Sequence, residues 1–289
     1  MPTSRGETIL NPEQPDPSSL ARERRLEEAL QAFLTPHRTP LTPREEALLR
    51  RGTKLGIVGG LAVTSWGEGP TVLLVHGWNS RGTHWGAYVD ALTEAGFRAV
   101  GVDAPAHGDS PGDRCHVLGY GLRLVEVARQ VGPLAGVVAH SFGAGATVLA
   151  LDRGLRAERV ALLSGPASLA KVVERWGRGH LLPEGEIAAF LDRVERAVGE
   201  PIEELDLMRI VVGLDQPALI VHDRSDEDVP VGDGLAVAEA WPGARMLVTE
   251  RYGHRRILIA REVVREVLAF LKNGRPGWAT HDSTGSPTG

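Results

Sequence analysis

Ser141 stands where the character of the chain changes abruptly. The apolar segment 137–140 (VVAH) leads into it, and four small residues follow at 143–146 (GAGA). A strand that ends on a serine and turns at once into a helix needs small neighbours, because the helix must pass close to the strand. Such a turn holds the hydroxyl out as a nucleophile, and the following helix directs free N–H groups toward an oxyanion. Strand-to-helix turns also use glycine and serine for structural reasons. Other residues must therefore show whether Ser141 is a nucleophile.

A serine hydroxyl becomes a good nucleophile only when a base accepts its proton, and that base needs an orienting acid. In a sheet of this kind the acid and the histidine follow the serine in chain order, each after a strand. His254 follows one apolar segment in LVTERYGHRRIL, and LIVHDRSDEDVP places three acids after the segment before it. We therefore expect His254 to be the base. Asp223, Asp226 and Asp228 are the candidates for the acid.

Five other histidines fit structural roles better. His76, His84 and His107 precede the serine in the chain. His140 is the immediate neighbour of the serine and should point to the opposite face of its strand. His222 still lies within its strand pattern. We expect all five to be hydrogen-bonded structural residues.

The elements that must position these groups follow a regular alternation. Short aliphatic segments recur at 71–77, 97–104, 134–140, 159–165, 217–223 and 244–250. Helical patterns separate most of them, which indicates an α/β fold with a mostly parallel, doubly wound sheet covered on both faces. Functional groups gather at the carboxyl ends of such strands, and nearly every segment ends in His, Asp or Ser.

The alternation stops at 166–215, where helical spacing replaces it. We interpret this insertion as a small helical cap over the strand ends; an elaborated crossover on a sheet face is the alternative. Its apolar residues either line the substrate site or pack the helices together: Trp176, Leu181, Leu182 and Phe190.

The rest of the chain divides into an N-terminal extension at 1–53, a core at 54–165 and 216–272, and a tail at 273–289. The extension is expected to be partly disordered, with surface helices at 19–34 and from Pro43. The tail is rich in Gly, Pro and polar residues and is expected to be disordered.

Several motifs within 54–272 together resemble the α/β-hydrolase family. HGW (76–78) is similar to the HG-x turn after the family's third strand, and VDAPAHGDS (102–110) is similar to its D-x-P-G-H-G-x-S loop. The resemblance implies that the backbone N–H groups of Trp78 and Phe142 form the oxyanion hole. It also implies an α/β-hydrolase fold, in which a helical cap is common, and ester hydrolysis without a cofactor.

Two further segments carry the resemblance. HDRSDEDVP is similar to the family's H-G-x-x-D-x-x-V-P segment, which aligns Asp226 with the catalytic acid and puts Asp223 at the glycine position. GHRRIL matches the loop that brings in the catalytic histidine, here His254. The serine motif AHSFG departs from G-x-S-x-G at Ala139. Asp228 stays an alternative acid beside Asp223.

Composition and missing motifs exclude other classes. The chain has 289 residues with 32 Lys and Arg against 37 Asp and Glu, so its net charge of −5 predicts no nucleic-acid partner. One cysteine and no long apolar segment predict a cytoplasmic protein without a membrane span. Val148 breaks a G-x-G-x-x-G fingerprint, no P-loop occurs, and the histidine spacing predicts no metal site.

The sequence therefore predicts a cofactor-independent serine hydrolase that cleaves a carboxylic ester of a small or medium acyl substrate. The alternative is a protein that binds a ligand or partner on the same scaffold without turnover. Ester, thioester, lactone, amide and C–C bonds are all cleaved on this scaffold, so the sequence leaves the bond type and the physiological substrate open.

Overall fold

The computed structural model describes residues 17–273, so the expectations for 1–16 and for the end of the tail lie outside the described residues. A single eight-stranded sheet has the order β1-β2-β4-β3-β5-β6-β7-β8. Its strands are β1 (Thr53–Val58), β2 (Leu61–Trp66), β3 (Thr71–Val75), β4 (Arg98–Val102), β5 (Leu134–His140), β6 (Val160–Leu163), β7 (Ala218–Asp223) and β8 (Arg245–Thr249). All pairs from β4 to β8 are parallel, which confirms the predicted mostly parallel sheet.

The antiparallel hairpin β1–β2 extends one edge of the sheet, where β2 pairs with β4. Gly59 and Gly60 join its strands with φ of 57° and 85°, values that favour glycine. The alternation of apolar segments did not predict this hairpin. Its first strand is largely exposed, so it lacks the continuous apolar pattern of the buried strands.

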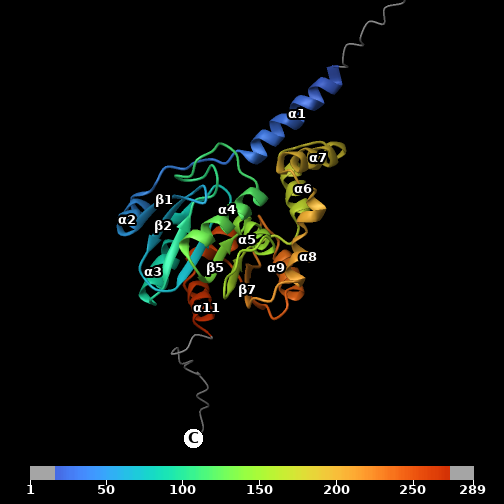
Figure 1. Cartoon of the computed structure of the whole chain (residues 1–289). Helices are drawn as coiled ribbons and strands as arrows, with labels where there is room; N and C mark the ends of the chain where they lie inside the picture. The colour runs from blue at the N-terminus through green and yellow to red at the C-terminus, as the bar shows by residue number, and fades with distance from the viewer. Residues whose placement is uncertain (1–16, 274–289) are drawn as a thin grey trace, which may run out of the picture.

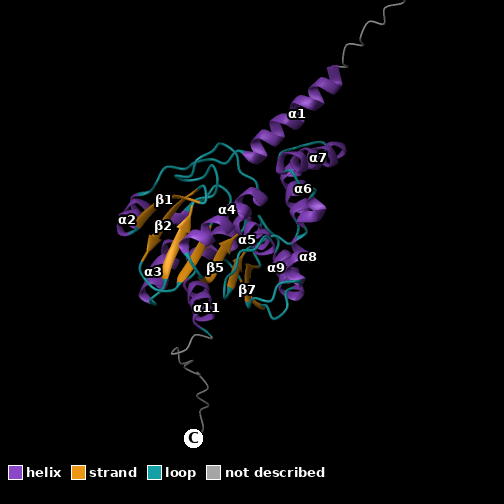
Figure 2. Cartoon of the chain, in the orientation of Figure 1, coloured by secondary structure: helices purple, strands orange, loops and turns teal. Residues whose placement is uncertain are grey.

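Helices cover both faces of the sheet (Figures 1 and 2). One face packs against α4 (Val117–Val131), α5 (Phe142–Asp152) and α9 (Val231–Ala240); the other packs against α3 (Gly86–Glu94) and α11 (Arg261–Lys272). Strand β3 shows the period of two: Leu73 and Val75 belong to the first core cluster, whereas Val72 and Leu74 belong to the second.

Three helices occupy the long connection between β6 and β7: α6 (Leu169–Gly179), α7 (Ile187–Val198) and α8 (Leu207–Val212). In Figure 1, α6 and α7 stand beside the sheet layer, next to α1. Helix α8 instead packs against α5 and α9. The connection therefore combines a projecting helical pair with a helix that covers the sheet face.

The N-terminal helix α1 (Pro17–Leu34) packs against α7. Its Leu26 is fully buried, and Phe33 contacts the rings of Trp176 and Phe190 edge-on, with centroids 5.2 and 5.7 Å apart. Two ion pairs support this contact: Arg193–Glu23 joins α7 to α1, and Arg25 of α1 pairs with Glu186, the residue before α7. The extension thus fastens the α6–α7 pair. Helix α2 (Pro43–Arg51) starts at Pro43, as predicted, and its N-cap Thr42 forms a capping box with Glu45.

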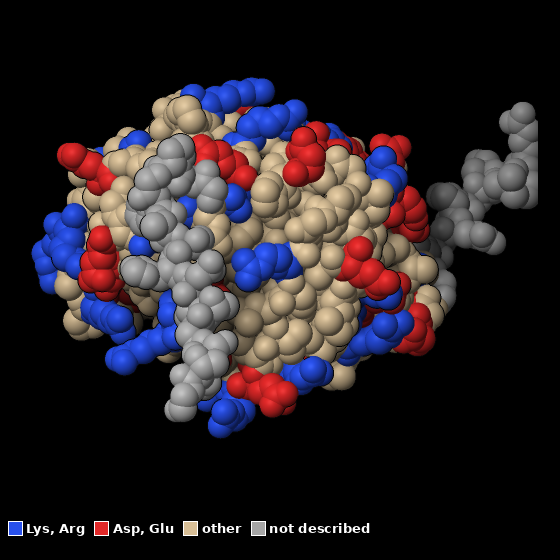
Figure 3. Space-filling model, turned by 90° about the horizontal axis from the view of Figure 1, so that it is seen from below, with Lys and Arg blue, Asp and Glu red and all other residues tan. Residues whose placement is uncertain are grey.

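The surface is mixed in charge on the face that Figure 3 shows. Basic and acidic side chains alternate there around uncharged surface, and neither sign forms a continuous field. Within residues 17–273, no helix has the length and hydropathy that a bilayer span requires.

The aromatic contact between α1 and the α6–α7 pair yields a stability prediction. Phe33→Ala should lower the free energy of unfolding by about 2 kcal/mol, because it removes two edge-to-face contacts and partly buried apolar area. It should also speed amide hydrogen exchange in α7. Leu20→Ala, in the exposed part of the same helix, should change neither quantity. Equal effects of the two substitutions, measured by urea unfolding and hydrogen exchange, would contradict the fastening role.

Candidate active site

Ser141 is the single residue between the end of β5 and the start of α5. Its backbone has φ 53° and ψ −120°, a conformation that is strained for a residue with a side chain. A hydrogen bond of 2.9 Å from its N–H to the Leu163 carbonyl holds the turn. A Cβ on Gly143 would lie 2.4 Å from the carbonyl oxygen of His76, so only glycine permits this approach of α5 to β3. Gly143 therefore has the predicted steric cause, whereas a Cβ on Gly145 would make only ordinary contacts, at 3.5 Å or more.

The structure brings together the three residues that the sequence predicted. The Oγ of Ser141 lies 2.8 Å from Nε2 of His254. On the other side of the ring, Nδ1 of His254 lies 2.8 and 3.1 Å from the two carboxylate oxygens of Asp226. When Nδ1 donates its proton to the carboxylate, Nε2 is left as the acceptor that faces the serine hydroxyl.

Asp226 is buried and receives several hydrogen bonds. Burial alone raises the pKa of its carboxyl group, but hydrogen bonds from His222, His254 and the Val229 N–H outweigh it and hold that pKa well below the ordinary value. The Val229 N–H bond is 2.8 Å long, and the Asp228 N–H donates to the same oxygen at 3.0 Å. The carboxylate is therefore ionised and fixed in one orientation beside the imidazole.

Asp223 is fully buried but has a different set of partners. It accepts hydrogen bonds from the N–H and Oγ–H of Ser225, from Oγ1–H of Thr249 and from the N–H of Tyr252. Burial raises the pKa of this carboxyl group, yet these bonds lower it below its usual range. Asp223 thus ties the turn that carries Asp226 to the turn that carries the histidine, without contacting the imidazole.

The predicted oxyanion donors lie on two segments that meet at the serine. Phe142 is the first residue of α5, so its N–H has no acceptor within the helix. A Cβ on Gly77 would lie 3.1 Å from Cβ of Ser141, which shows how closely the turn before Trp78 approaches the serine. The rings of Trp78 and Phe142 are in edge contact at 5.1 Å. Donation by both N–H groups to an oxyanion stays a prediction.

Two buried histidines brace the turn that carries Trp78. His76 donates from Nδ1 to the Gly77 carbonyl at 2.7 Å and accepts the Ala104 N–H at Nε2. His107 accepts the N–H of Asn79 at 3.1 Å. Burial lowers the pKa of His107 to about 4 and that of His76 well below its ordinary value. Both imidazoles are therefore neutral at pH 7, as their acceptor roles require.

The other histidines expected to be structural are also hydrogen-bonded. His140 donates from Nε2 to the backbone carbonyl of His254 at 2.8 Å, and burial lowers its pKa to about 3. It thereby supports the loop that holds the candidate base. His222 donates to the Val229 carbonyl at 2.9 Å. The ring of His84 lies on the surface, 2.7 Å from the hydroxyl of Ser80.

The four apolar residues predicted for the insertion mostly pack its helices. Phe190 and Leu182 are buried, and the rings of Trp176 and Phe190 stack with centroids 5.3 Å apart. Leu181, at the end of α6, is 87% exposed. Trp176, Leu182 and Phe190 therefore pack the helices together, which was the alternative role. Leu181 faces solvent. A substrate-lining role for any of them stays a prediction.

In the described part of the chain, no three His, Cys, Asp or Glu side chains are grouped so as to hold a metal ion. A hydroxyl, an imidazole and a carboxylate in hydrogen-bonded series are suited to acyl transfer.

The sheet order, the covering helices and the serine turn after β5 define the protein as having the α/β-hydrolase fold. Solved structures agree. An esterase from Exiguobacterium antarcticum matches with a TM-score of 0.57 and 19% identity over 76% of this chain and 99% of its own. The bromoperoxidase from Bacillus anthracis gives 0.59 and 20% over 76% and 100%. These identities establish the fold alone.

In sequence, the chain is similar to pimeloyl-[acyl-carrier protein] methyl ester esterases. The Aeromonas hydrophila enzyme is 25% identical over 236 residues, which is 67% of this chain and 92% of that enzyme. The Nitrosospira multiformis enzyme is 30% identical over 57% of this chain and 63% of its own. The match to the Methylococcus capsulatus enzyme, at 44%, covers only 20% of that enzyme. No family model matches the chain.

The contacts of the three acids predict separable effects of Asp→Asn substitutions. Asp226→Asn should lower kcat on an activated ester by about 10⁴-fold with little loss of stability, because the amide favours the wrong histidine tautomer. Asp223→Asn should mainly lower the melting temperature, because it disturbs two hydrogen bonds within its own turn and two that reach Thr249 and Tyr252. Asp228→Asn, an exposed side chain, is the matched control. A near-normal rate for Asp226→Asn would overturn the assignment.

The buried neutral histidines predict a loss of stability in mild acid. Unfolded histidines titrate near pH 6.5, whereas the pKa of folded His107 is about 4, so the unfolded chain binds more protons between these values. Stability should therefore fall as the pH drops from 6.5, by about 2 kcal/mol at pH 5 for this residue. The lowered pKa values of the Asp223 and Asp226 carboxyl groups affect the free energy of unfolding only below about pH 4. Urea unfolding at pH 7 and 5 should show a smaller difference for His107→Gln; an unchanged difference would refute this account.

Proposed function

We propose that the protein is a cofactor-independent serine hydrolase that cleaves a carboxylic ester of a small or medium acyl substrate. The observation that carries the proposal is the continuous hydrogen-bonded series from Ser141 through His254 to Asp226. The esterase activity named for the curated relatives supports an ester as the bond that is cleaved.

In the proposed mechanism, Oγ of Ser141 attacks the ester carbonyl carbon while Nε2 of His254 takes the hydroxyl proton. Asp226 holds the Nδ1–H and stabilises the imidazolium that forms. The N–H groups of Trp78 and Phe142 donate to the tetrahedral oxyanion, where each such donor typically contributes about 10²- to 10³-fold to the rate. The imidazolium then protonates the leaving alcohol, and an acyl-enzyme remains.

The second half of the reaction repeats these roles with water. His254 takes a proton from a water molecule, whose oxygen attacks the acyl carbonyl. Collapse of the second tetrahedral species breaks the bond to Oγ, and the proton returns to Ser141 as the carboxylic acid leaves. The strained, fixed turn at the serine supports this proposal, because it holds the nucleophile in place through both steps.

The helical pair α6–α7 is the proposed cap of the site. Five residues separate the end of β6 from the start of α6, and β6 lies beside β5, whose end precedes the serine. The pair therefore begins at the carboxyl edge of the sheet, where a cap limits the length of the acyl chain. The buried ring of Phe190 would act there by fixing the position of the helices.

The nucleophile can be tested with two measurements on one variant. Ser141→Ala should lower kcat on a p-nitrophenyl ester by about 10³- to 10⁶-fold and abolish labelling by a fluorophosphonate, while the melting curve is retained. Ser168→Ala, which removes the N-cap hydroxyl of α6, should keep both labelling and turnover. If the wild-type protein is neither labelled nor active, the alternative of a binding protein without turnover is the correct one.

A further inference from the structure

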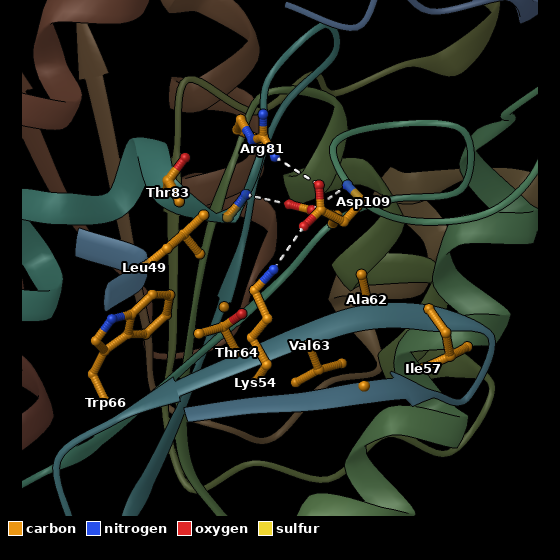
Figure 4. A pocket seen from close by; sticks show the side chains of 14 residues that line it. Leu49, Lys54, Ile57, Ala62, Val63, Thr64, Trp66, Arg81, Thr83 and Asp109 are labelled. Atoms are coloured by element: carbon orange, nitrogen blue, oxygen red, sulfur yellow. Dashed lines mark hydrogen bonds and ion pairs between the residues drawn. The ribbon is translucent and has the colours of Figure 1, made fainter. Parts of the chain in front are cut away.

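A cavity of about 170 Å³ lies at the edge of the sheet that the hairpin β1–β2 forms, between this hairpin and the turn at 81–83 (Figure 4). Apolar side chains form part of its walls: Leu49, Ile57, Ala62 and Trp66. Charged side chains gather at one end, where Arg81 and Lys54 converge on Asp109. Ser141, His254 and Asp226 do not line this cavity.

Arg81 is a buried guanidinium with weak partners. The residue is 6% exposed, and its nearest acceptors are an oxygen of Asp109 at 3.2 Å and the Thr39 carbonyl at 3.4 Å. Its Nε–H is buried and has no acceptor among the described residues. Charge-assisted hydrogen bonds are usually 2.7 to 2.9 Å long, and a buried charge is costly unless it is well paired. The guanidinium therefore retains unused capacity for an anion.

The carboxylates near Arg81 leave some of the hydrogen-bonding capacity of its guanidinium unused. Asp109 is half exposed, and its carboxylate is shared with Lys54, whose Nζ lies 3.4 Å away. The other acid, Asp103, accepts the N–H groups of Gly82 and Asp109 at 2.7 Å each, so its oxygens are committed to the backbone. Burial also raises the pKa of Asp103, which weakens it as a counterion. Two cations thus share one loosely held, displaceable carboxylate.

We infer that this cavity binds a small organic carboxylate. The carboxylate of the ligand takes the place of the Asp109 side chain between Arg81 and Lys54, and its apolar body lies against Trp66 and Ala62. A cavity of about 150 Å³ accommodates benzene, so a benzoate-sized acid matches the volume. Inorganic phosphate offers the charge without the apolar body. The inference concerns a site separate from the serine and does not depend on the proposed hydrolase function.

Isothermal titration with benzoate tests the inference through two variants of opposite effect. Lys54→Glu should weaken benzoate binding by about tenfold, because it replaces a cation of the site by an anion. Asp109→Asn should tighten binding several-fold, because it removes the internal competitor. Lys171→Glu, an exposed position on α6, makes the same charge change far from the cavity and should leave the affinity unchanged. Benzamide and inorganic phosphate should bind more weakly than benzoate.

An NMR signal from the Arg81 side chain reports where benzoate binds, independently of these variants. In the intact protein, the NMR signal of its Nε–H should move as benzoate is added and stay in place with benzamide. Absence of benzoate binding would overturn the inference. So would equal weakening by Lys54→Glu and Lys171→Glu, looser binding to Asp109→Asn, or an Nε–H signal that does not respond to bound benzoate.

Discussion

The close approach of α5 to the end of β3 is the contact on which the rest of the site depends. Gly143 permits it, because any side chain there would collide with the backbone of His76. The approach leaves Ser141 alone between strand and helix in a strained conformation. It also sets the first N–H of α5 beside the turn that follows β3. One steric constraint thus brings Ser141 close to the two N–H groups that are predicted to bind an oxyanion.

Around this contact, buried polar groups join loops that are distant in the chain. His140 links the end of β5 to the loop of His254, and Asp223 links that loop to the turn of Asp226. Each of these groups is buried, so a missing partner would cost free energy that water cannot restore. The neutral state of His140 and the ionised state of Asp223 therefore both help to hold these loops together.

Local pattern and chain order accounted for the fold class and for much of the site. Six continuous apolar segments predicted six of the eight strands, and for the five that are buried on both faces this pattern is the expected signal. The order of Ser141, the acidic turn and His254 predicted that these residues would meet, since the carboxyl ends of parallel strands share one edge. The exposed first strand of the β1–β2 hairpin carried no such pattern and was missed.

The sequence by itself determined where the strands lie, that Ser141 stands at a tight turn, and which short segments supply the acid and the base. Only the tertiary structure decided which carboxylate faces the imidazole, because the three candidates lie within six residues and differ by the direction of their side chains. The convergence of Arg81, Lys54 and Asp109 was likewise invisible in the sequence. Periodicity reports which face of an element is buried, whereas contacts between distant turns depend on how the packed elements fix backbone directions in space.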